Sequence, residues 1–414
     1  MCRLYPERHK YKAGVLGRRM RKVIFISLTI ITWFGCKKPY LGPAASSGTA
    51  ATGFLVVEGT INTGADSTII RVSRTVPLGS ARRSEPVTDA TVMVESDAGG
   101  TYGLPSYGNG YYKTGPLNLS ALNKYRLRIT TVNGTAYQSD FVVVKNSPPI
   151  DSVYYRILNN GVEIYADTHD PSNNTKYYRW EYESTYQFHS AFYSFLRLVT
   201  SPQDTLLPRI LPDQIYVCYR GSKATTILLN SSAKLTQDVI AQNPIAFIPS
   251  SSEELQDRYS ILVKQYALTP EAFNYYQQLK KNTEQLGSIF DAQPSELPGN
   301  IHCLTNPAEP VLGYITAGAS AQQRIYINNR DLPAWITNSP YTGCKLDTDL
   351  FVRPQGSQVI NEVKDNIYTG AHMGIFTIEP PGSNHILGYG AAVPECVDCT
   401  LRGTNVRPSF WIDE

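Results

Sequence analysis

The sequence lacks the short motifs that mark the common nucleotide-dependent and hydrolytic enzymes. It has no Walker A loop, no glycine-rich dinucleotide fingerprint, no H-E-x-x-H helix and no G-x-S-x-G elbow. His302 beside Cys303 could belong to a metal site, but a histidine that is hydrogen-bonded within the fold or exposed to solvent is the simpler interpretation. We therefore predict a protein that is not an enzyme and carries no metal or cofactor. The six histidines are scattered, without metal-ligand spacing: His9, His169, His189, His302, His372 and His385.

Charged residues are also scarce, at 18% of the 414 residues, and the net charge of +3 is unevenly distributed. Residues 1–35 hold eight Lys or Arg against one acid, which leaves 30 basic and 34 acidic residues from Cys36 onward, a net charge of −4. A mildly acidic surface binds nucleic acid poorly, because neutralising phosphates requires basic side chains. We expect no nucleic-acid partner.

The longest apolar run, from Val23 to Phe34, is too short to cross a membrane, because a spanning helix needs about 20 residues. A basic segment followed by such a run is typical of a signal peptide. We assign residues 1–35 to a signal peptide, with Met20 as a plausible true start.

The small residue Gly35 directly before Cys36 resembles the lipobox of bacterial lipoproteins, although Trp33 stands where leucine is usual. In such proteins the cysteine is acylated and the peptide is cut before it. Two or three acyl chains anchor firmly, at roughly 0.8 kcal/mol per buried methylene. We predict lipidation of Cys36 and a flexible tether over residues 36–53, which are rich in Gly, Ala, Ser and Pro. A plain secretory signal and a single membrane anchor are the alternatives.

The remaining sequence is typical of a mainly β protein, with 28 tyrosines, a strand-favouring residue. For residues 54–147 we predict an immunoglobulin- or transthyretin-like β-sandwich, in which Asn133-Gly134 forms a hairpin turn. Apolar and polar residues alternate in several of its β-favouring runs, as expected for strands with one buried face. The expected strands are Phe54–Val57, Thr68–Arg74, Thr91–Glu95, Tyr125–Thr131 and Phe141–Val144.

Pro148-Pro149 marks a boundary, because proline disfavours helix. For residues 148–334 we predict a fibronectin-III-like β domain that contains a hairpin at Asn160-Gly161 and a strand in which Tyr178, Trp180 and Tyr182 alternate with charged residues. Two segments, 313–315 and 324–327, are expected to close this domain. Residues 335–414 are predicted to form a turn-rich C-terminal extension.

One helix is expected near residues 270–286, inserted in the second β domain. Thr269 can cap it, Pro270 suits its first turn and Gly287 ends it. Its apolar stripe is predicted to consist of Phe273, Tyr276, Leu279, Thr283 and Leu286.

Five cysteines follow Cys36: Cys218, Cys303, Cys344, Cys396 and Cys399. Disulfides are the default beyond the inner membrane, and an odd number leaves at least one thiol outside any intrachain pair. Free buried thiols and a redox or zinc role for the Cys-x-x-Cys pair are the alternatives, and the sequence does not fix the pairing.

Aromatic residues crowd one short stretch, and we predict that they form a partner surface. Exposed tyrosines give flat contact area of low conformational entropy. The alternative is that they fill the core or a satellite cluster. The residues are Tyr182, Tyr186, Phe188, Phe192 and Tyr193, with Phe195 beside them.

An ordered set of motifs resembles the DUF4249 family of Bacteroidetes lipoproteins. They are Phe54–Ile61, Pro149–Val153, Tyr177–Tyr182, Arg258–Tyr266, Gly287–Pro294, Gly299–Ile301, Cys396–Cys399 and Pro408–Trp411. The family carries no catalytic residues to transfer. The resemblance implies an outer-membrane lipoprotein that assists a TonB-dependent β-barrel receptor in nutrient uptake.

Two other functions remain open, a structural or adhesive envelope lipoprotein and an enzyme. The orientation is open as well, because Lys37-Lys38 follow Cys36 where surface export often uses acidic residues.

Overall fold

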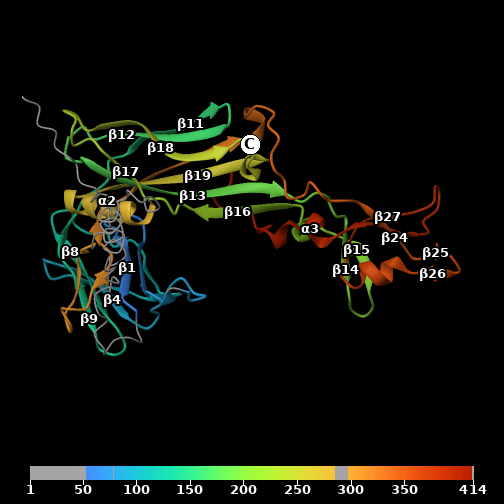
Figure 1. The fold of residues 1–414 in the computed structure, drawn as a ribbon, viewed down its shortest axis with the longest axis horizontal. Coiled ribbons are helices and arrows are strands. Elements are labelled where there is room, and N and C mark those ends of the chain that lie inside the picture. Colours follow the sequence, from blue (N-terminus) through green and yellow to red (C-terminus); the bar gives the residue numbers. More distant parts are fainter. Residues whose placement is uncertain (1–52, 78, 285–296, 413–414) are drawn as a thin grey trace, which may run out of the picture. The chain divides into compact units, whose positions relative to one another are not determined.

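The computed structural model describes residues 53–77, 79–284 and 297–412. From Phe54 onward they form a single unit that is mainly β with one long helix, as predicted (Figure 1). The predicted signal peptide, Cys36 and the tether up to Thr52 lie outside the described residues. Within the described ranges, no helix combines the length and the apolar character that crossing a membrane requires.

The first β-sandwich packs two sheets around one core. One sheet has the order β21-β1-β2-β7-β6, with β22 also on β1 and β3 on β2; the other has the order β20-β9-β8-β4-β5, with β10 on β8. The first sheet contains β1 (Leu55–Ile61), β2 (Thr68–Arg74), β3 (Glu85–Pro86), β6 (Ser106–Gly108), β7 (Tyr111–Thr114), β21 (Val311–Leu312) and β22 (Thr316–Ala317). The second contains β4 (Thr91–Ser96), β5 (Thr101–Leu104), β8 (Lys124–Thr130), β9 (Ala136–Ser139), β10 (Val142–Val143) and β20 (Ile301–Cys303).

The alternating pattern of this sandwich is confirmed. Ile70 and Val72 of β2, like Leu127 and Ile129 of β8, are buried in the shared core. The turn between β8 and β9 is also confirmed, because Gly134 has a φ of +82° there, which glycine adopts without strain.

The chain returns to the first sandwich late in the sequence, which differs from the prediction for segment 313–315. That segment is not a strand; it lies between β21 and β22, which both pair in parallel with β1. Likewise β20 pairs with β9. Only segment 324–327 closes the second sandwich, within β23. Neighbouring strands in a sheet are usually close in sequence, so a local sequence pattern does not predict pairing between strands this far apart.

The second sandwich consists of two packed sheets. One has three strands in the order β11-β12-β18, and the other has five, in the order β16-β13-β19-β23 with β17 on β13. Trp180, Tyr178 and Phe188 from β13 fill its core together with Val162 and Ile164 from β12. Its strands are β11 (Ile150–Leu158), β12 (Gly161–His169), β13 (Tyr177–His189), β16 (Val217–Lys223), β17 (Leu228–Ser231), β18 (Val239–Pro249), β19 (Arg258–Ala267) and β23 (Ala321–Asn328). Two 3-10 turns accompany it, η2 (Glu253–Leu255) and η3 (Asn329–Asp331).

The long helix α2 (Pro270–Glu284) follows β19 where a helix was predicted. Its cap is confirmed, since the Ala272 N–H donates to the Thr269 hydroxyl at 3.2 Å. The buried face differs by about one residue from the predicted stripe. Ala272 and Tyr275 are buried, whereas Thr283 is exposed. Leu286 of the predicted stripe and Gly287, predicted to end the helix, lie outside the described residues.

The predicted C-terminal extension has a small sheet of its own, β24-β28-β27. Leu196, from the β14–β15 hairpin of the preceding domain, joins its core together with Val363, Ile367 and Tyr389. We call this part the small lobe. Its elements are β14 (Leu196–Val199), β15 (Thr205–Pro208), η1 (Leu211–Asp213), β24 (Asp347–Leu350), β25 (Arg353–Gln355), β26 (Gln358–Ile360), η4 (Val363–Ile367), β27 (Met373–Ile378), β28 (Gly388–Ala392), α3 (Pro394–Val397) and η5 (Cys399–Leu401).

Candidate functional site

One disulfide joins the second sandwich to the C-terminal residues, and a second lies within those residues. Cys218 of β16 is bonded to Cys399 of η5, and Cys344 is bonded to Cys396 of α3. Cys303 is a free, buried thiol. The Cys-x-x-Cys pair is therefore not a redox dithiol, because its two sulfur atoms are bonded to different partners.

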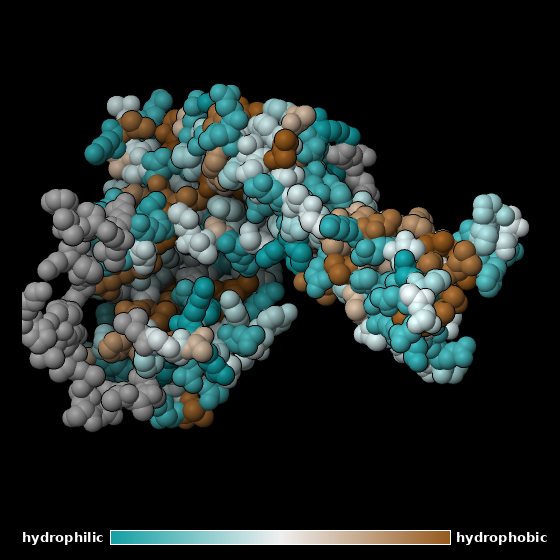
Figure 2. Space-filling model, turned by 45° about the vertical axis from the view of Figure 1, so that its right-hand side comes forward, coloured by the Kyte–Doolittle hydropathy of each residue, from teal (hydrophilic) through white to brown (hydrophobic). Residues whose placement is uncertain are grey.

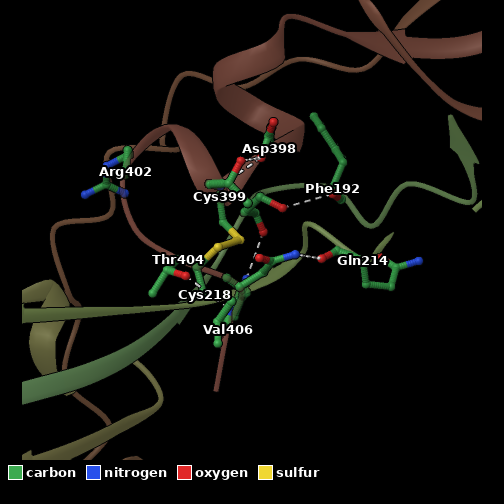
Figure 3. Close-up of a disulfide and its surroundings, with 12 residues drawn as sticks. Phe192, Gln214, Cys218, Asp398, Cys399, Arg402, Thr404 and Val406 are labelled. Atoms are coloured by element: carbon green, nitrogen blue, oxygen red, sulfur yellow. Dashed lines mark hydrogen bonds between the residues drawn. A yellow bond between two sulfur atoms is a disulfide. The ribbon is translucent and has the colours of Figure 1, made fainter. Parts of the chain in front are cut away.

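Backbone hydrogen bonds hold the chain around the first disulfide (Figure 3). The Cys399 N–H donates to the Ile215 carbonyl at 2.9 Å, and Tyr219 and Thr404 exchange two backbone hydrogen bonds of 2.8 and 3.0 Å. The Phe192 N–H donates to the Cys396 carbonyl at 3.1 Å. The disulfide thus reinforces a junction that the backbone already makes.

The aromatic residues predicted as a partner surface are divided between core and surface. Tyr186 and Phe188 are buried in the second sandwich, and Tyr182 is partly buried against the same core. Phe192 is partly buried over the second disulfide. Of the five, Tyr193 alone is exposed, with 37% of its surface accessible. The prediction is therefore wrong for Tyr186 and Phe188.

A smaller aromatic surface remains next to the small lobe. The rings of Tyr193 and Phe195 have centroids 4.9 Å apart, and Tyr216 lies 5.3 Å from Tyr193. Hydrophobic side chains gather over the small lobe (Figure 2). Contiguous exposed apolar area commonly marks a contact surface. The exposed residues include Phe195, Leu207, Ile210, Leu211, Val352 and Val359.

A cavity of about 970 Å³ lies between the outer faces of β1 and of β13 and β19, with α2 along one side. Sequence reasoning did not find it, because its walls come from both sandwiches. Its floor carries Arg179, Glu181 and Glu183 of β13. These three side chains alternate along the strand with its buried residues. This alternation, visible in the sequence, indicates that they face away from the core.

Arg179 contacts two tyrosine rings on this floor. Its guanidinium carbon lies 4.6 Å from the Tyr266 centroid and 4.7 Å from the Tyr276 centroid, a cation–π arrangement with each ring. The Nη1 group donates to Glu181, which also accepts from the Tyr266 hydroxyl at 3.2 Å. Burial alone would lower the pKa of Arg179, but Tyr276 and Glu181 raise it overall. The arginine is therefore a fixed, permanent cation.

A second charged group lies beside it. Glu183 accepts a hydrogen bond from Lys264 at 3.0 Å and pairs with Lys223 at 3.3 Å. Burial acts to raise the pKa of Glu183, but the hydrogen bond and charge of Lys264, with Lys223, lower it overall. Glu183 is ionised at neutral pH and unsuited to act as a general acid.

His302 and Cys303 do not form a metal site. They are adjacent on β20, and strand alternation points them to opposite faces: Cys303 is buried, whereas His302 pairs at the surface with Asp140 at 3.2 Å. Within the described ranges, no three His, Cys, Asp or Glu side chains are grouped so as to hold a metal ion.

Two solved structures resemble parts of the chain. A two-domain fibronectin type-III segment of chicken tenascin is 10% identical, with a TM-score of 0.15, over 52% of this chain and 91% of that one. The Yersinia pseudotuberculosis adhesin InvE is 11% identical, with a TM-score of 0.14, over 51% of this chain and 54% of that one. No curated protein matches the chain.

A family model described as "Domain of unknown function (DUF4249)" matches residues 45–324. The match includes the motifs from Phe54 to Ile301 that carried the resemblance, and ends before those at Cys396–Cys399 and Pro408–Trp411. Because it spans more than half of the sequence, the chain belongs to the DUF4249 family.

Proposed function

We propose that the protein is a non-catalytic outer-membrane lipoprotein, anchored through Cys36, that serves as an accessory or ligand-binding partner of a TonB-dependent β-barrel receptor in nutrient uptake. The observation that carries this proposal is the order of features at the N-terminus. A basic segment and a short apolar run lead to Gly35-Cys36 and a tether, and the folded unit then begins at Phe54.

The two disulfides support a location beyond the inner membrane, because such bonds persist in oxidising compartments and are rare in the cytosol. The exposed aromatic surface around Tyr193 and Phe195 supports a binding role, since aromatic side chains are enriched where proteins meet.

A structural or adhesive envelope lipoprotein is the second candidate. Such a protein would use the same anchor and could use the same aromatic surface. The two candidates differ in whether a β-barrel receptor accompanies the protein.

Both parts of the proposal can be tested in cells of the source organism that express the tagged full chain. Labelling with a clickable palmitate should mark the wild type and the Cys303→Ser control, but not Cys36→Ser. Unchanged labelling of Cys36→Ser would refute the anchor. The wild type, solubilised in mild detergent, should co-purify with a large β-barrel protein. A labelled protein without such a partner would favour the structural or adhesive role.

A further inference from the structure

We infer that the cavity between β1, β13, β19 and α2 binds a neutral oligosaccharide, a ligand with many hydroxyl groups and apolar ring faces. This inference rests on the proposed function for its context, since the sugar would be the nutrient or part of it. The volume of about 970 Å³ lies at the upper end of the usual range for ligand pockets, about 300–1,000 Å³. The cavity therefore has room for several linked rings.

The charges on the floor favour an uncharged ligand. Arg179 is paired with Glu181, and Glu183 is paired with both Lys264 and Lys223. A charged ligand would have to compete with these pairs, and breaking a partly buried pair leaves an uncompensated charge. A neutral ligand can bind with every pair intact.

The same groups retain hydrogen-bonding capacity for hydroxyls. An ammonium group has three donors and a carboxylate has about four acceptor positions. Lys223, with 80% of its side chain exposed, uses one donor on Glu183, and Glu181 keeps acceptor positions beyond those used by Arg179 and Tyr266. A hydroxyl both donates and accepts, so it can satisfy neighbouring groups of either kind.

The walls add apolar surface. Tyr276 and Tyr314 are partly buried at the cavity, and Ile69 and Leu312 leave 44% and 36% of their surfaces accessible there. Aromatic rings combine a flat apolar face with a polar tip, which suits the C–H face and the hydroxyl edge of a sugar ring.

The floor is less suited to a peptide. The strands β13 and β19 are internal to their sheet, so their backbone groups are already used by neighbouring strands. An extended peptide binds best by adding its backbone to a free strand edge. Recognition on this floor depends on side chains instead.

The test uses the full mature chain in detergent and calorimetric titration with short neutral oligosaccharides of glucose, mannose and xylose. Oligouronates and neutral peptides form the comparison arms. We expect a neutral oligosaccharide to bind. Ile69→Trp places a larger side chain in the cavity and should weaken binding by at least about tenfold. Ile157→Trp is the matched control, because Ile157 is also 44% exposed on a strand but lies away from the cavity.

A second variant tests one of the hydrogen-bond donors directly. Lys223→Ala removes one exposed donor and should weaken binding by about threefold, with the melting temperature unchanged. Stronger binding of peptides or uronates, binding of no oligosaccharide, or equal affinities of the two tryptophan variants would overturn the inference. Because the titration contains no receptor, its failure is distinguishable from a failed co-purification.

Discussion

Trp180 donates a hydrogen bond from its indole Nε1 to the Oε1 atom of Gln265, at 3.0 Å, in the core of the second sandwich. Gln265 is fully buried. Its amide nitrogen lies 3.0 Å from the Pro148 carbonyl and the Thr168 hydroxyl, and 3.1 Å from the Ser147 hydroxyl. One side chain thus connects β19 to β13, β12 and the segment that leaves the first sandwich.

Replacing this glutamine should destabilise the protein strongly. Gln265→Ala leaves the Trp180 N–H without a buried partner, which costs about 1–3 kcal/mol. It also removes one of the two hydrogen bonds to the Pro148 carbonyl, which keeps the one from the Ser147 hydroxyl, and it opens a cavity in the core. We expect the free energy of unfolding to fall by about 2–4 kcal/mol in urea titrations. The control Gln322→Ala, at an exposed position on the neighbouring β23, should change it by less than about 0.5 kcal/mol. Similar effects of the two variants would contradict this role.

The return of the chain to the first sandwich depends on two glycines. A Cβ atom at Gly313 would lie 2.0 Å from the Val57 carbonyl oxygen, and one at Gly299 would lie 2.0 Å from the Gly313 carbonyl oxygen. We expect Gly313→Ala to lower the free energy of unfolding by about 2–4 kcal/mol, because the φ of +133° is also unfavourable for alanine. Gly343→Ala, with open space around it, should be neutral. A neutral Gly313→Ala would show that β21 does not pack as closely on β1 as described.

Local patterns were sufficient to locate the long helix and several strands of both sandwiches, among them β1, β2, β4, β8 and β13. Period-two alternation identified β2 and β8. The same alternation indicates that part of the predicted partner surface is buried. Tyr186 and Phe188 have the same parity as Tyr178 and Trp180 on one strand, so all four point into the core. Tyr193 lies beyond the end of that strand, where parity no longer applies.

Other features depend on contacts between segments that lie far apart in the sequence. The cavity has walls on both sandwiches, and β1 pairs with segments about 256 residues away, as between Thr60 and Thr316. The small lobe combines the β14–β15 hairpin with strands from the C-terminal part of the chain. Disulfide pairing likewise depends on which cysteines the fold brings together, so Cys218–Cys399 could not be derived from spacing.

Acid should weaken a turn centred on Asp170. Its carboxylate accepts backbone hydrogen bonds from Ser172, Asn174 and Thr175 at 2.8–3.0 Å. Burial acts to raise the pKa of Asp170, but these bonds and the Ser172 hydroxyl lower it overall from 3.8 to about 2. Because the pKa is lower in the folded state, the stabilisation is present above about pH 4 and is lost as the pH falls through about 2.

Asp170→Ala should therefore lower the free energy of unfolding by about 1–2 kcal/mol at pH 7, and the difference from wild type should shrink between about pH 4 and pH 2. The exposed Asp204→Ala is the control and should show no such trend. Urea titrations at a series of pH values would measure both. A deficit that stays constant down to pH 2 would assign the effect to packing and not to the carboxylate.

The two disulfides should contribute unequally to stability. They join residues 181 and 52 positions apart, and in the chain-entropy model the longer closed loop restricts the unfolded chain more. We expect loss of about 5 kcal/mol for the double variant Cys218→Ala with Cys399→Ala, and about 4 kcal/mol for Cys344→Ala with Cys396→Ala. The Cys303→Ala control lacks only a free thiol and should keep the reductant sensitivity of the wild type. Urea unfolding with and without a phosphine reductant measures these effects. If reduction leaves the wild type as stable as before, the disulfides do not stabilise the fold.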